Sequence, residues 1–172
     1  MRRIAIATCV AALLIPMTSA SSQPLGAEPR GITCTVTGAA KFTPGITSEP
    51  QELKFAFKGE FTDCQSSGEA ASAKVTSKGI IEDASCAYGA ATGIAKIKWD
   101  DGSKSVVEFT TEDVAALVTL QGIVTKSNAD VPQEGDDVFA ALAFNADPTL
   151  CDTEEGITEA EFGGQAGGGS PQ

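Results

Sequence analysis

The chain has 172 residues, of which 42% are apolar, 12 are basic and 23 are acidic, so its formal net charge is −11. One domain of this size can bury a substantial core, but the acidic balance disfavours binding to nucleic acid, whose phosphates are also negative. The sequence has no His, which excludes Ser-His-Asp triads, Cys-His dyads and His-based zinc sites.

The first twenty residues follow the order of an export signal. Arg2 and Arg3 precede an apolar run over residues 4–15, and the small residues Thr18-Ser19-Ala20 come next, as signal peptidase requires. The apolar run is shorter than the roughly 20 residues of a membrane-spanning helix. We therefore expect cleavage after Ala20 and a secreted, extracellular product with four Cys and no membrane span. An uncleaved anchor is the alternative.

Two segments flank the expected folded unit. Residues 21–30 contain two Pro and one Gly without periodicity, and are expected to form a flexible leader. Residues 163–172 contain five Gly and one Pro, a composition typical of a disordered tail. Residues 31–162 are left as a single β domain.

Alternation of apolar and polar residues dominates this domain. It is clearest at Leu53, Phe55, Phe57 and Phe61, which alternate with charged or small residues and predict a strand with one buried face. Turn-forming residues separate this strand from seven further candidates, at 32–39, 70–82, 92–99, 103–111, 114–126, 137–145 and 156–162. About eight short strands indicate an all-β fold, an antiparallel sandwich or barrel.

Residues 112–121 could also form a helix, because they are rich in Ala and Leu. The following Gly122-Ile123-Val124 favours a strand instead. The candidate strand 114–126 is apolar on both faces. That pattern indicates a central strand covered on both sides.

A hairpin is expected over residues 93–109, turning on Asp100-Asp101-Gly102. A three-residue loop with Gly last fits a type I turn closed by a bulge, because Gly adopts the left-handed conformation at low cost. This loop opposes Ile97 to Ser105 and Ala95 to Val107. It also places Trp99 and Phe109 on one face and the lysines on the other.

The four Cys of the exported chain are well separated, which indicates two structural disulfides. If the strands run alternately up and down, Cys34 and Cys64 lie at one end of the fold, and Cys86 and Cys151 at the other. A bridge from Cys64 to Cys86 would cross roughly 20 Å or more of strand, whereas a disulfide spans about 4.4–6.8 Å between Cα atoms. We therefore predict the pairs Cys34–Cys64 and Cys86–Cys151.

No motif predicts a catalytic, cofactor-binding or metal-ligating residue. The sequence has no G-x-S-x-G, no CxxC and no Gly-rich loop leading into a helix. Calcium binding by the acidic loop 128–137 is one hypothesis, but its spacing does not match an EF-hand and a solvated turn is favoured. Its candidate ligands are Asn128, Asp130, Glu134, Asp136 and Asp137. The single Trp, Trp99, is interpreted as the cap of a core rather than a platform for a ligand.

Several phrases have a family likeness: ITCTVTGAAKFTPG, FAFKGEFTDCQSS, GIAKIKWDDGSKSVVEFTT and LQGIVT. They resemble small exported β-proteins of actinobacteria over about residues 32–162. The resemblance implies a source class and no activity or site residues.

Two hypotheses of function follow. The first is a secreted, non-catalytic β domain that binds an extracellular ligand or an envelope component, with no cofactor. The alternative is a hydrolase without His that uses two carboxylates, or a Ser with a Lys base.

Overall fold

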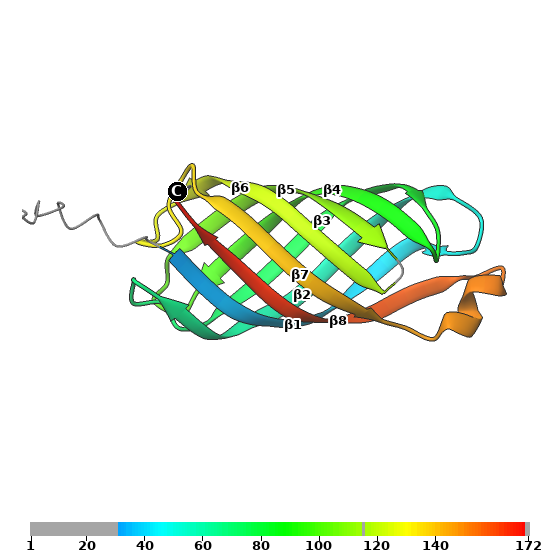
Figure 1. Cartoon of the computed structure of the whole chain (residues 1–172), viewed down its shortest axis with the longest axis horizontal. Coiled ribbons are helices and arrows are strands. Elements are labelled where there is room, and N and C mark those ends of the chain that lie inside the picture. The colour runs from blue at the N-terminus through cyan, green and yellow to red at the C-terminus, as the bar shows by residue number, and fades with distance from the viewer. Residues whose placement is uncertain (1–30, 115, 171–172) are drawn as a thin grey trace, which may run out of the picture.

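The computed structural model describes residues 31–114 and 116–170; the expected signal peptide (1–20) and leader (21–30) lie outside them. Within the described residues, eight antiparallel strands form one closed barrel in which each strand pairs with its neighbours in sequence and β8 returns to β1 (Figure 1). The strands are β1 (Gly31–Ile46), β2 (Gln51–Ser66), β3 (Ala73–Ala84), β4 (Tyr88–Trp99), β5 (Lys104–Val114), β6 (Leu117–Ser127), β7 (Asp137–Asn145) and β8 (Ile157–Gly169), with a 3-10 helix η1 (Pro148–Asp152) before β8. The all-β expectation is confirmed, and of its two architectures the chain adopts the barrel.

The alternation in the sequence decides which side chains enter the barrel. On β2 the side chains of Leu53, Phe55 and Phe57 face the interior, whereas Lys54 and Lys58 on the same strand are exposed outside. Closing the sheet turns the apolar face of every strand inward. The barrel therefore has an apolar interior, and its outer wall exposes charged residues such as Lys54 and Lys58 together with apolar ones such as Ile94.

The predicted hairpin is confirmed in its register. Ile97 opposes Ser105 and Ala95 opposes Val107 across β4 and β5. The Trp99 amide donates to the Ser103 carbonyl at 3.0 Å. Gly102 has the expected left-handed backbone, with φ of 89°.

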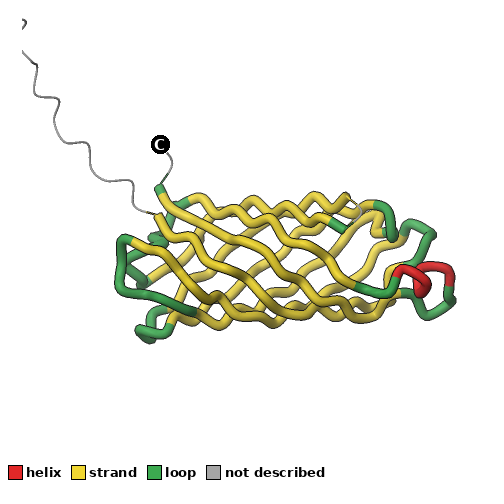
Figure 2. Tube along the Cα trace, turned by 60° about the horizontal axis from the view of Figure 1, so that its bottom comes forward, coloured by secondary structure: helices red, strands yellow, loops and turns green. Residues whose placement is uncertain are grey.

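Loops gather at the two ends of the barrel, and η1, in red, lies at one of them (Figure 2). The last residues of β8 lie at the opposite end (Figure 1). We call the end that holds the start of β1 and the end of β8 the plug, and the end that holds η1 the mouth. The described residues form two disulfides, Cys34–Cys64 toward the plug and Cys86–Cys151 at the mouth. The strand-parity prediction is thus confirmed, and the disulfides indicate an oxidising, non-cytoplasmic environment.

The plug is filled by a packed core. Trp99 is 2% exposed, and its indole nitrogen donates to the Ser105 hydroxyl at 3.0 Å. Ser105 in turn is 3.0 Å from the Ser127 hydroxyl, which donates to the Pro132 carbonyl. Apolar side chains including Ile32 pack around this network. Trp99 is therefore a core residue, as interpreted from the sequence.

The prediction of a disordered tail is wrong for residues 163–169. They form the second half of β8, paired with β1 on one side and β7 on the other. A Cβ on Gly164 would clash with the carbonyl oxygen of Ala141, and one on Gly167 would lie 2.5 Å from Phe139 Cζ. Glycine is present here because neighbouring atoms approach closely, so the β domain extends to Gly169.

The expected strand 114–126 also needs correction. Val114 belongs to β5, and β6 begins only at Leu117. Leu117 and Ile123 are about half exposed on the outer wall, so nothing in the barrel covers this strand on its second face. Among the described residues, no helix has the length and apolar character needed to cross a membrane.

Candidate functional site

The barrel encloses an elongated cavity of about 470 Å³, lined by residues from all eight strands. On β4 the lining runs from Tyr88 to Ile97, which corresponds to about 23 Å along the axis for strands rising about 3.3 Å per residue with a tilt of about 40°. Most lining side chains are Phe, Leu, Ile, Val or Ala. We call this cavity the lumen.

The lumen stays open because phenylalanine rings lie against glycines of the same strand or of nearby strands. A Cβ on Gly59 or Gly38 would lie 2.5 or 2.6 Å from Phe57 Cζ. A Cβ on Gly93 would lie 2.8 Å from Phe109 Cζ and 3.1 Å from Phe55 Cζ. A ring over a glycine occupies the space next to the wall rather than the space at the centre. These inward-facing rings are therefore part of the wall of the lumen and not a filler of it.

Further aromatic contacts continue around the wall. The ring of Phe144 on β7 lies 6.2 Å from that of Phe42 on β1 and 5.4 Å from that of Phe162 on β8. Phe162 makes an edge-on contact with Phe57 at 6.1 Å. Such pairs prefer tilted or edge-to-face geometries. Phe57, Phe144 and Phe162 remain only partly buried, because one side of each ring faces the lumen.

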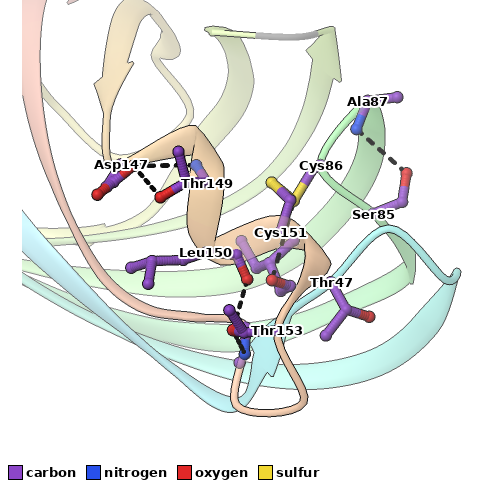
Figure 3. Close-up of a disulfide and its surroundings, with 12 residues drawn as sticks. Thr47, Ser85, Cys86, Ala87, Asp147, Thr149, Leu150, Cys151 and Thr153 are labelled. Atoms are coloured by element: carbon purple, nitrogen blue, oxygen red, sulfur yellow. Dashed lines mark hydrogen bonds between the residues drawn. A yellow bond between two sulfur atoms is a disulfide. The ribbon is translucent and has the colours of Figure 1, made fainter.

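The mouth is held by loops that bond to one another (Figure 3). The Cys86–Cys151 disulfide joins the turn between β3 and β4 to η1. The Cys86 amide donates to the Thr47 carbonyl, and the Ser48 amide donates to the Cys151 carbonyl, both at 3.0 Å. At the start of η1, Asp147 Oδ1 accepts from the Thr149 amide and hydroxyl. Three loops are thereby tied into one rim.

Polar side chains are few in the lumen, and one of them is charged. Asp113, next to the last residue of β5, is the only charged residue among the described lining residues. Gly89 of β4 and Val118 of β6 flank it in register. Burial raises the pKa of the Asp113 carboxyl, and the Thr111 hydroxyl partly opposes this shift. Asp113 Oδ1 is buried without a hydrogen-bond partner within the described structure.

The hydrolase hypothesis requires groups that the lumen does not bring together. A two-carboxylate mechanism needs a second acid beside Asp113, and a Ser with a Lys base needs a lysine. The described lining residues contain Ser77 and Ser85 but neither a second carboxylate nor a lysine. The geometry therefore gives this alternative no support in the lumen.

The acidic loop 128–137 lies at the plug, away from the mouth. Asp136 is 6% exposed; its Oδ2 accepts from the Gln133 amide at 2.7 Å and its Oδ1 from the Ser170 hydroxyl at 3.1 Å. Within residues 31–114 and 116–170, no three acidic or Cys side chains gather as metal ligands would. Asp136 acts here as a loop-stabilising acceptor.

No family model, curated protein or solved structure matches this chain. Function must be argued from the lumen. The resemblance to exported actinobacterial β-proteins stays a prediction.

Sequence reasoning missed both the lumen and Asp113. The signal for Asp113 was present, because Val107, Phe109 and Thr111 alternate inward and the next inward position is 113. Ending the expected strand at 111 placed this carboxylate in a turn, outside the barrel interior.

Proposed function

We propose that this protein is a non-catalytic binding domain that holds one small apolar molecule in its lumen. The observation that carries the proposal is the apolar cavity of about 470 Å³ between a packed plug and a mouth. Small-molecule sites commonly measure about 300–1,000 Å³, and eight-stranded barrels are wide enough to hold one small ligand. A ligand there would remove from water the ring faces of Phe57, Phe144 and Phe162.

Exposed apolar residues at the outer edge of the mouth support entry of the ligand at this end of the barrel. Tyr88, Val114 and Leu117 are adjacent across β4, β5 and β6 and are 52%, 69% and 51% exposed. An apolar molecule approaching the mouth meets apolar surface before it reaches the lumen.

Export fits the same function, because an apolar compound outside the cell needs a protein to keep it dissolved. We infer secretion after cleavage at Ala20, consistent with the disulfides. N-terminal sequencing of the protein from culture supernatant should begin at Ser21. Full-length protein in the membrane fraction would contradict export.

Two alanines on β4 provide a matched test of binding. Ala91 faces the lumen and is 4% exposed, whereas the next residue back, Ala90, is exposed on the outer wall. Ala91→Phe should block the lumen and abolish binding of the neutral fluorescent probe N-phenyl-1-naphthylamine. Ala90→Phe adds the same ring outside and should leave binding unchanged.

Circular dichroism checks that both variants keep the barrel. NMR chemical-shift changes on adding the probe to the wild-type protein test the same site without any variant. They should map to lumen residues such as Val107 and Phe162. Binding that survives Ala91→Phe in a folded barrel, or shifts confined to the outer wall, would reject the lumen as the site.

A further inference from the structure

The mouth of the lumen contains a carboxylate with no partner of opposite charge. Asp113 projects inward one residue before β5 ends. Its Oδ1 is buried and accepts no hydrogen bond from the described residues. Neither Lys nor Arg occurs among the described lining residues. A buried polar atom without a partner carries a desolvation cost that a donor would remove.

Gly89 lies beside this carboxylate on the neighbouring strand. A Cβ on Gly89 would be in ordinary contact with Asp113 Oδ2, at 3.5 Å, and would lie 3.1 Å from Ile81 Cγ2. The terminal torsion of an aspartate is broad and roughly two-fold. Either oxygen can therefore turn toward a molecule in the lumen.

Building on the proposed binding function, we propose that the ligand is an amphipathic amine whose apolar body fills the lumen and whose protonated nitrogen donates to Asp113 at the mouth. The apolar stretch between Asp113 and the plug receives the body, and the carboxylate receives the head. A protonated nitrogen supplies both the missing donor and the opposite charge, the combination that gives the stronger hydrogen bonds.

Charge disfavours the opposite class of ligand. A fatty acid would bring its carboxylate beside Asp113 with no basic side chain in the lining to receive it. The net charge of −11 further favours a cationic ligand over an anionic one, because it raises the concentration of cations near the protein and lowers that of anions. Neutral alcohols have no charge to pair with Asp113 and should bind by their apolar body alone.

Three ligands with one alkyl chain separate these effects: dodecylamine, dodecanol and dodecanoate, titrated by calorimetry at pH 7 below micelle-forming concentrations. We expect dodecylamine to bind about tenfold or more tightly than dodecanol, the gain typical of a charged hydrogen bond in a desolvated site. Dodecanoate should bind more weakly than dodecanol.

The variant Asp113→Asn removes the charge with little change of shape. It should abolish the advantage of the amine while dodecanol binding stays within about threefold of wild type. Asp137→Asn is the matched control, because it removes the same charge from an exposed position at the other end of the barrel. It should keep the amine preference.

The outcomes distinguish the two proposals. If none of the three compounds binds the folded wild-type protein, the binding function itself is rejected. If dodecanol binds as tightly as dodecylamine, or if Asp113→Asn and Asp137→Asn reduce amine binding equally, the lumen binds ligands but the role of Asp113 is rejected. Melting curves confirm that each variant is folded before its titration is interpreted.

Discussion

The packing of phenylalanine rings over glycines can be tested with a single methyl group. In Gly93→Ala the added Cβ would lie 2.8 Å from Phe109 Cζ, 3.1 Å from Phe55 Cζ and 2.8 Å from the carbonyl oxygen of Lys78. The rings can turn into the lumen, but the carbonyl belongs to the backbone of β3 and cannot move alone. The substitution therefore both strains the β3–β4 pairing and narrows the lumen.

Overpacking of this kind costs about 1–3 kcal/mol. Replacing Gly by Ala also restricts the unfolded chain, which returns about 0.4–1 kcal/mol. We expect Gly93→Ala to lower the free energy of unfolding by about 1–2 kcal/mol, measured by urea unfolding, and to lower the melting temperature by about 2–4 °C per kcal/mol. Affinity for N-phenyl-1-naphthylamine should fall in parallel.

Gly163→Ala is the matched control. Gly163 also lies within a strand, but the nearest atom to its added Cβ is the carbonyl oxygen of Val36 at 4.0 Å. This variant should be as stable as wild type or slightly more stable, with unchanged probe affinity. If Gly93→Ala proves as stable as Gly163→Ala and binds the probe equally well, the reasoning about ring placement is wrong.

Three further predictions follow from other parts of the barrel. Replacing Cys86 and Cys151 by Ala should lower the free energy of unfolding by about 4.3 kcal/mol, and replacing Cys34 and Cys64 should lower it by about 3.6 kcal/mol. The larger loss is expected for Cys86–Cys151 because it closes 65 residues, whereas Cys34–Cys64 closes 30. If urea unfolding gave the larger loss for Cys34–Cys64, the loop-entropy argument would be contradicted. Burial raises the pKa of Asp113, so the ionised carboxyl destabilises the folded chain and Asp113→Asn should be more stable than wild type at pH 7. The difference in free energy of unfolding between the two proteins should disappear below the ordinary pKa of 3.8, where the wild-type carboxyl is protonated in both states. A difference that stays constant with pH would show that charge is not its cause. Ser105→Ala leaves the Trp99 indole without its acceptor and should cost about 1–3 kcal/mol, without changing probe affinity, because Ser105 lies in the plug.

The strands, the hairpin register and the disulfides could be predicted because they depend on local alternation and on strand parity. The length of the turn that ends at Gly102 could be predicted because only a three-residue turn places Phe109 on the face opposite the lysines. The pairing of Cys86 with Cys151 could be predicted by counting the strands between them. These arguments need only the order of residues along the chain.

The lumen could not be predicted in the same way. Phenylalanines at inward positions normally fill a core, and only the glycines opposite them on neighbouring strands place the rings against the wall. Gly59 and Phe57 lie on one strand, but Gly38, Gly79 and Gly93 lie beneath phenylalanine rings that belong to other strands. Composition likewise assigned residues 163–169 to disorder, because the reason for their glycines lies in the atoms of β1 and β7.

The seam between β1 and β8 has a consequence for how the chain folds. Closure pairs the first described strand with the last, Gly31 opposite Gly169, and such long-range pairing makes folding slow. Until β8 is placed, β1 and β7 are open strand edges able to pair with other chains. Since β8 is synthesised after all its partners, a chain truncated before Gly163 should aggregate rather than form a smaller barrel.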